Sequence, residues 1–329
     1  ALPEHLDLIS ARTEFYDHPA ALPVVERSSI KMDLHRRDFT INTLALRLDG
    51  EYLGQIFDFW GGYDDLMQGQ IRVLHALSFV DDATRMLRAV RFAERFNFEI
   101  ETRTLSLLSA SLPLIDQLSG ARIQHELDLI FLEGKVPQIM QTLQNLGILT
   151  AIHPELGWSP LQQERIKLIS GNVEENNLSL KDLQTSIWLL WLEIYPDATI
   201  TKLSKRLRLT AKQVERIRQT AQLRELLPAV QQMKPSQITQ TLIGYPELVI
   251  QTVIFSDVDQ ARVQPLRDYL DTYRRVKPYT TGADLKKRGL PPSPRYDTIL
   301  SELHTAWLDG KIDSYEEEIS LLDHLLKAE

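Results

Sequence analysis

Hydrophobic and polar positions follow two different periods along the chain, and the change falls near residue 62. In the first sixty residues, apolar and polar side chains alternate over 5–11, and an apolar run at 52–57 follows the turn signal Asp49-Gly50. A period of two is that of a half-buried strand, and Asp-Gly between apolar runs is typical of a β-hairpin. This part of the chain is predicted to form a small antiparallel sheet, with a short helical turn and a strand over 39–48.

Beyond residue 62, apolar residues recur every three or four positions, which is the period of an amphipathic helix. Helices are predicted over 81–96, 104–118, 121–132, 136–146, 161–169 and 180–194. Another helix begins after Thr210, which has the side chain of an N-cap. Trp188 and Trp191 lie in an apolar stretch and are predicted to be buried. The predicted fold is mainly α, with a partial α/β head over 1–62 and an elongated multi-helical remainder in segments 63–157, 158–255 and 256–329.

Composition excludes several classes of protein. The 329 residues contain no cysteine, so disulfides and thiolate metal sites are excluded, and a reducing, cytoplasmic location is expected. No apolar run approaches eighteen residues, so no membrane span is expected. The first residues lack the apolar core of a signal peptide and begin without Met, which favours a processed or truncated end.

Net charge is −8, but the charge is segregated along the chain, and total charge is then a poor guide to nucleic-acid binding. The segment 202–218 has one acid, Glu215, among the basic residues Lys202, Lys205, Arg206, Arg208, Lys212, Arg216 and Arg218. Two smaller basic groups are Arg274, Arg275 and Lys277, and Lys286, Lys287 and Arg288. These segments are candidates for contacts with RNA phosphates, although a solvated helix face is the commoner explanation for any one of them alone.

Four short motifs follow one another over about a hundred residues. They are Arg36-Arg37-Asp38-Phe39-Thr40-Ile41-Asn42, Asp58-Phe59-Trp60-Gly61-Gly62, Asp81-Asp82-Ala83-Thr84-Arg85 with its continuation to Phe92, and Arg122-Ile123-Gln124-His125-Glu126. Their order and spacing resemble motifs B, C, D and E of the class II tRNA nucleotidyltransferases. That family contains CCA-adding enzymes, A-adding enzymes and bacterial poly(A) polymerases. The resemblance implies a polymerase-β-like nucleotidyltransferase head followed by a helical neck, body and tail, and covers the C-terminal three quarters of such an enzyme.

Asp82 and Arg85 carry the most specific chemistry. They are three residues apart, so one helix would place them on one face, and a carboxylate accepts hydrogen bonds where a guanidinium only donates. Adenine and cytosine present an amino donor beside a ring-nitrogen acceptor, whereas guanine and uracil present a carbonyl beside a ring N–H. The pair therefore fits A and C, and the resemblance implies that it selects nucleotides without a nucleic-acid template. The alternative is an ordinary surface ion pair on a helix.

The resemblance extends to the residues around this pair. Arg88 and Arg91 would bind the triphosphate, as guanidinium groups do, or would form a basic face paired to Glu94. Arg37, Asp38 and Asn42 would bind phosphate and ribose, or would cap the chain locally. Structural support is implied for Asp81, Gly61, Gly62, Arg122 and Glu126. Glycine at 61–62 suits a springy link between head and neck, and Asp81 stands where the family usually has Glu.

The metal site expected of this chemistry is missing from the sequence. Phosphoryl transfer of this kind uses magnesium held by clustered carboxylates, which the family supplies from an Asp-x-Asp strand after a glycine turn. The one Asp-x-Asp of this chain, Asp257-Val258-Asp259, lies far beyond the other motifs and is interpreted as a surface pair. The metal ligands are therefore expected upstream of Ala1, with Asp7 as a candidate third carboxylate, and the chain by itself is expected to be inactive.

The leading hypothesis is an enzyme that adds A, or C and A, from ATP and CTP to the 3′ end of tRNA, with magnesium as cofactor. Its partner would be the acceptor and T-arm side of tRNA, with neither DNA nor a membrane involved. The segment 281–292 resembles the tail module of the family. A poly(A) polymerase and a catalytically silent RNA-binding module remain as alternatives.

Overall fold

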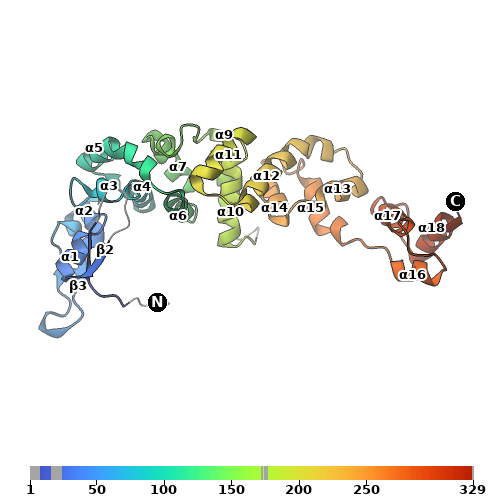
Figure 1. The fold of residues 1–329 in the computed structure, drawn as a ribbon, viewed down its shortest axis with the longest axis horizontal. Helices are drawn as coiled ribbons and strands as arrows, with labels where there is room; N and C mark the ends of the chain where they lie inside the picture. The colour runs from blue at the N-terminus through green and yellow to red at the C-terminus, as the bar shows by residue number, and fades with distance from the viewer. Residues whose placement is uncertain (1–7, 16–23, 172, 174–176, 328–329) are drawn as a thin grey trace. The chain divides into compact units, whose positions relative to one another are not determined.

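The computed structural model describes residues 8–15, 24–171, 173 and 177–327. The chain forms two compact units. The first contains residues 1–173, 178–187 and 195–214, and the second contains residues 174–177, 188–194 and 215–329. The predicted mainly helical fold with a small sheet-containing head is confirmed (Figure 1).

The head consists of short antiparallel strand pairs and one-turn helices. Strand β1 (Arg12–Phe15) pairs with β2 (Val24–Arg27), and β3 (Ala45–Leu46) pairs with β4 (Ile56–Phe57). Between them lie α1 (Ile30–His35), η1 (Thr40–Thr43) and η2 (Gly50–Tyr52). The predicted helical turn before a strand in 39–48 is confirmed by η1 and β3.

Two strand predictions are wrong in part. The return strand predicted from residue 52 is confined to β4, because the 3₁₀ turn η2 takes up the residues after Asp49. The strand predicted over 5–11 is absent from 8–11, and residues 5–7 lie outside the described residues. The first described strand starts one residue later, at Arg12.

Helices form the rest of the first unit. They are α2 (Gly62–Gln68), α3 (Ser78–Asp81), α4 (Arg85–Phe96), α5 (Thr102–Ser111), η3 (Leu112–Gln117), α6 (Gly120–Ile130), α7 (Val136–Asn145), α8 (Ile148–Ile152), α9 (Pro160–Gly171) and α11 (Asp197–Leu207). A small parallel pair, β5 (Gln70–Ile71) with β6 (Glu99–Ile100), also lies in this part of the chain. Met86, Leu87 and Val90 of α4 are completely buried, so this helix runs through the core of the unit.

The prediction of a single helix over 81–96 is wrong, because the helix is interrupted at Asp82. Its backbone is extended, with φ −143° and ψ 102°, between the end of α3 and the start of α4. The Asp82 carboxylate accepts hydrogen bonds from the amide and the hydroxyl of Thr84, at 2.9 and 2.6 Å. A side chain that satisfies amides at a helix start favours this position over the helix interior.

Helices α10 (Leu180–Leu192) and α12 (Ala211–Val230) each contribute to both units. The second unit continues with α13 (Pro235–Leu242), α14 (Glu247–Phe255), α15 (Gln264–Asp271), η4 (Tyr273–Arg275), α16 (Gly282–Lys287), α17 (Arg295–Leu308) and α18 (Tyr315–Lys327). Thr210 caps α12 as predicted, since its hydroxyl accepts from the amide of Gln213. Trp188 and Trp191 are buried, which confirms that prediction. No helix among the described residues is long and apolar enough to cross a membrane.

The last helices pack around a buried carboxylate, Glu318 of α18. One of its oxygens, Oε1, accepts from the amide and the hydroxyl of Thr280, at 2.6 and 2.5 Å. The other, Oε2, accepts from the Tyr279 amide at 2.9 Å and from Trp307 Nε1 at 2.6 Å. Beside it, Leu285, Ile299, Leu303 and Leu322 form an apolar core. Glu318 thus ties the segment before α16 to α17 and α18.

Candidate nucleotide-selecting site

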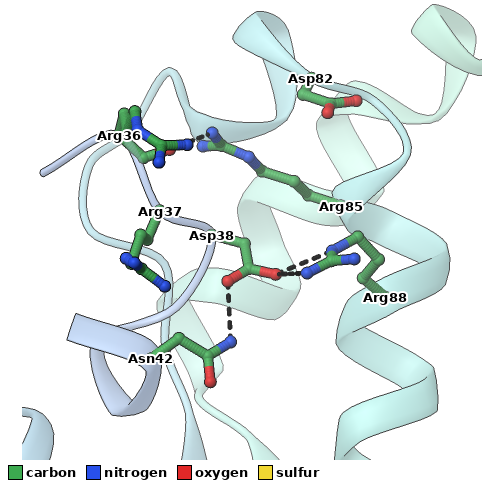
Figure 2. Close-up of a pocket in the computed structure, with 7 residues that line it drawn as sticks. All are labelled: Arg36, Arg37, Asp38, Asn42, Asp82, Arg85 and Arg88. Atoms are coloured by element: carbon green, nitrogen blue, oxygen red, sulfur yellow. Dashed lines mark hydrogen bonds and ion pairs between the residues drawn. The ribbon is translucent and has the colours of Figure 1, made fainter. Parts of the chain in front are cut away.

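A pocket of about 310 Å³ brings together residues from two segments of the first unit. It is lined by Arg36, Arg37, Asp38, Asn42, Asp82, Arg85 and Arg88 (Figure 2). Arg36, Arg37 and Asp38 lie between α1 and η1, and Asn42 lies in η1. Asp82 lies between α3 and α4, and Arg85 and Arg88 lie in the first turn of α4. Six of the seven residues predicted to bind nucleotide therefore line one pocket, and Arg36 joins them.

The loop that carries Arg36 and Arg37 is held by Asp33, which is buried in α1. Asp33 accepts from Arg36 at 2.9 Å, from Arg37 at 3.3 Å and from the Arg12 amide at 3.1 Å. Burial alone would raise the pKa of Asp33, but these partners lower it below its ordinary value. Asp33 was missed by sequence reasoning, although its spacing of three and four residues from two arginines on a helix is a recognisable signal.

Asp38 is the electrostatic centre of the pocket. Its Oδ2 accepts from Nε and Nη2 of Arg88 at 2.8 and 2.5 Å, and its Oδ1 accepts from Asn42 and from the Phe39 amide at 2.8 and 3.0 Å. Burial alone would raise the pKa of Asp38, but Arg88 and the hydrogen-bond donors lower it. The bond to Phe39 is the local capping weighed above, while the ion pair spans fifty residues and closes the head against α4.

Arg88 and Arg91, both predicted to bind phosphate, lie in different surroundings. Arg88 lines the pocket with its guanidinium committed to Asp38, and the carboxylate raises its pKa although burial acts to lower it. Arg91 is buried, does not line the pocket, and lies 3.7 Å from both Glu126 and Glu133. Glu94 accepts from Thr142 instead of pairing with either arginine. Arg91 is therefore part of the buried core of the unit, where it connects α4 to Glu126 and Glu133.

Asp82 and Arg85 line the same pocket but are not bonded to each other, which excludes the surface ion pair. Arg85 is buried and turned toward Arg36, whose carbonyl oxygen accepts from Nη2 of Arg85 at 2.8 Å (Figure 2). Asp82 accepts three hydrogen bonds on Oδ1, two from Thr84 and one from Arg122 at 2.6 Å. No hydrogen bond to its second oxygen, Oδ2, is found among the described residues.

Two side chains of helix α6, those of Arg122 and Glu126, contact residues that line the pocket. Arg122 holds Asp82 in the way just described, and Glu126 lies 3.8 Å from Arg88 and 3.7 Å from Arg91. Burial raises the pKa of Glu126 above its ordinary value, although the two arginines act to lower it. Asp81, also predicted as support, ends α3 with its carboxylate 3.6 Å from Nε2 of His75.

Gly61 precedes α2 as its N-cap, and Gly62 is the first residue of the helix. Gly61 has a φ of 73°, which disfavours other residues. A Cβ on Gly62 would lie 2.3 Å from the carbonyl oxygen of Thr40, so a side chain cannot fit there without movement. The Asp58 carboxylate accepts from the amides of Gly62 and Tyr63 at 2.8 and 3.0 Å. The Thr40 hydroxyl donates to the Asp65 carboxylate at 2.6 Å, and this bond fastens α2 to η1, which carries Asn42.

The basic segment 202–218 is not one helix, because α11 ends at Leu207 and α12 begins at Ala211. Arg206 is turned inward and donates to the carbonyl oxygens of Ile115, Leu118 and Ile152 at 2.8, 2.7 and 3.0 Å. Its backbone also lies against α6, where a Cβ on Gly120 would be 2.2 Å from the Arg206 carbonyl oxygen. The structure therefore contradicts a phosphate contact for Arg206, whose donors serve helix ends.

The other predicted RNA contacts differ in how free they are. Lys205, Arg208 and Lys212 are exposed around the junction of α11 and α12, whereas Lys202 pairs with Glu155 at 2.6 Å. In the second unit, Arg288 pairs with Asp323 and Lys287 lies 3.4 Å from Asp284, while Lys286 is exposed. The exposed cations at the α11–α12 junction are the better candidates for phosphate contacts.

Carboxylates suited to a metal are not gathered in the described part of the chain. No group of three His, Asp or Glu residues that could hold a metal ion occurs among the described residues. Asp7 lies outside them. The interpretation of Asp257 and Asp259 as a surface pair is wrong for Asp257. This residue is buried, and its carboxylate lies 3.9 Å from the guanidinium groups of Arg224 and of Arg262. Magnesium, which the resemblance implies, is therefore assigned no residue in this structure.

Comparison with known proteins agrees with this architecture. Residues 2–72 match the family described as "Poly A polymerase head domain", and residues 97–158 match "Probable RNA and SrmB- binding site of polymerase A". The apo form II structure of a CCA-adding enzyme aligns with a TM-score of 0.79 and 28% identity, over 96% of this chain and 76% of that one. The Thermotoga maritima CCA-adding enzyme complexed with tRNA aligns with a TM-score of 0.73 and 29% identity, over 92% and 75%. The fold is therefore that of the CCA-adding enzymes, which are of the polymerase-β-like class.

Relatives narrow this class. The A-adding tRNA nucleotidyltransferase of Halalkalibacterium halodurans is 31% identical over 95% of this chain and 73% of its own length. This chain belongs to the family of A-adding and CCA-adding tRNA nucleotidyltransferases. The A-adding tRNA nucleotidyltransferase of Geobacter sulfurreducens is 34% identical over 96% of this chain, which spans 38% of that relative's length.

Proposed function

We propose that this chain is the nucleotide-selecting and RNA-binding part of an enzyme that adds A, or C and A, to the 3′ end of tRNA. Addition of A is the favoured activity, because the relatives from Geobacter and Halalkalibacterium are both A-adding tRNA nucleotidyltransferases. ATP, with CTP as a second substrate, is the proposed nucleotide. The proposed partner is tRNA, magnesium the proposed cofactor and the cytoplasm the proposed compartment.

The observation that carries this proposal is that Asp82 and Arg85 line one pocket without bonding to each other. Oδ2 of Asp82 can accept from the amino group of adenine or cytosine, and Arg85 can donate to the neighbouring ring nitrogen. Guanine and uracil would place a carbonyl against the carboxylate and an N–H against the guanidinium. A good bidentate contact is worth about 1–3 kcal/mol of discrimination.

The rest of the pocket suits the other parts of a nucleotide. Four arginines and two aspartates line it, which favours a polyanion such as a triphosphate. Arg37 is the proposed phosphate ligand, since its Nε is buried and has no hydrogen-bond partner among the described residues. Asn42 uses its Nδ2 on Asp38, so its oxygen is the group proposed to accept from a ribose hydroxyl.

The test is equilibrium binding of ATP, CTP, GTP and UTP to this chain, with incorporation into tRNA by the complete gene product as a second readout. Asp82→Ala and Arg85→Ala should each weaken ATP binding and reduce the preference of the chain for ATP over GTP by roughly tenfold. Asp64→Ala and Arg95→Ala are matched controls, because Asp64 is exposed on α2 and Arg95 pairs with Glu133 outside the pocket. Unchanged affinity and preference in both pocket variants would exclude the proposed base contact.

A further inference from the structure

The guanidinium of Arg85 is fixed by a residue outside the four motifs. Ser78, the first residue of α3, is completely buried, and its hydroxyl oxygen accepts from Nη1 of Arg85 at 2.7 Å. The Ser78 carbonyl oxygen lies 3.4 Å from the same nitrogen, while Nη2 donates to the Arg36 carbonyl oxygen. Both terminal nitrogens of the guanidinium are therefore anchored on the protein, which fixes the plane of the group.

Ser78 also reaches Asp82. Its carbonyl oxygen accepts from the Asp82 amide at 3.2 Å, at the end of α3. One buried residue thus contacts the backbone of the proposed acceptor and the side chain of the proposed donor. We infer that Ser78 is a positioning residue that fixes the order of donor and acceptor in the base slot, and so sets the preference for A and C over G and U. This inference rests on the proposed function.

The order matters because the two classes of base differ only in which position donates. A guanidinium that could slide or rotate would find a carbonyl acceptor on guanine or uracil and donate to it instead. With two terminal nitrogens held, Arg85 cannot make that adjustment without breaking bonds. On the other side, Arg122 and Thr84 hold Asp82 through Oδ1. Loosening Arg85 should therefore favour the wrong bases selectively, whereas general damage to the pocket would weaken all four nucleotides alike.

The experiment measures dissociation constants of the four nucleoside triphosphates for this chain by calorimetry, with wild type and Ser78→Ala. The ratio of GTP to ATP dissociation constants should fall roughly tenfold in Ser78→Ala, the effect expected for one hydrogen bond to a charged group. Ser78→Cys fills the space of the serine with a weak acceptor and should lower the ratio in the same direction. Thr220→Val is the control, since it removes a different buried hydroxyl, bonded to the Arg216 carbonyl at 2.7 Å, and should leave the ratio unchanged.

A double-mutant cycle separates positioning from mere structure. In an Arg85→Ala background, Ser78→Ala should cause no further change in the GTP to ATP ratio, because the group that it positions is gone. A wild-type chain without preference for ATP or CTP would sink the proposed function itself. A selective wild type whose ratio survives in Ser78→Ala and Ser78→Cys would overturn the role of Ser78 alone. An equal loss of affinity for all four nucleotides in Ser78→Ala would also overturn it. So would an undiminished effect of Ser78→Ala on the GTP to ATP ratio in the Arg85→Ala background.

Discussion

Substituting Glu318 by Gln tests whether the end of the chain is held together by one buried carboxylate. The change keeps the size of the side chain but turns one of its two oxygens into an NH2 group, which donates. Two of the four donors from Tyr279, Thr280 and Trp307 would then face a donor. Since a buried group without a partner costs about 1–3 kcal/mol, we expect a loss of roughly 2–5 kcal/mol in local stability.

Native-state hydrogen exchange of the full chain measures this loss where it occurs. The amides of Tyr279 and Thr280 both donate to Glu318, and a loss of about 2 kcal/mol would speed their exchange roughly thirtyfold. Burial alone would raise the pKa of Glu318, but its hydrogen-bond donors lower it. The stabilisation is therefore present above the ordinary pKa of a glutamate and is lost as pH falls through the lowered value. Glu318→Gln should lack this acid-side dependence.

Glu316→Gln is the matched control, because it removes the same charge from an exposed position in the same first turn of α18. It should change the exchange of the two amides by no more than the few tenths of a kcal/mol typical of a charge near a helix start. Equal exchange rates in Glu318→Gln and Glu316→Gln would refute the reasoning, since the four bonds would then contribute nothing beyond the charge.

Two further predictions concern the first unit. Gly62→Ala should lower the melting temperature by several degrees because its Cβ meets the Thr40 carbonyl, whereas Gly134→Ala, with open space around its Cβ, should not; equal melting temperatures would contradict the close approach. A salt titration of tRNA binding should give a flatter slope when three exposed cations are reversed to Glu, namely Lys205, Arg208 and Lys212. Arg206→Ala should instead leave the slope unchanged and lower stability, because three carbonyl oxygens lose their donor; a change of slope in this variant would place RNA on Arg206 after all.

Sequence reasoning found the pocket because its residues lie in two short motifs whose types and spacing are specific. It could not find the bonds across them. The ion pair between Asp38 and Arg88 joins residues fifty apart, and no local period records such a partner. The break at Asp82 was missed for a related reason, since an aspartate three residues before an arginine fits both a helix interior and a helix start.

The basic segment shows the same limit from the other direction. Charge alone grouped Arg206 with Lys205 and Arg208, yet one of the three points inward to the ends of η3 and α8 while its neighbours are exposed. The sequence identifies the cations, but only packing decides which of them water and RNA can reach. Helix content was predicted well because it depends on periodicity, and strand limits less well because strands of two residues carry almost no pattern.

The close approach of Gly120 to the Arg206 carbonyl oxygen couples the positions of helices α6 and α11. With no side chain between them, the backbones of α6 and α11 touch directly, and neither can shift without displacing the other. Two residues beyond Gly120 on the same helix, Arg122 grips the Asp82 carboxylate. A shift of α11 would therefore act on α6, the helix whose Arg122 holds the Asp82 carboxylate. A side chain at position 120 would push the two helices apart and so disturb the support of Asp82 together with the end of α11.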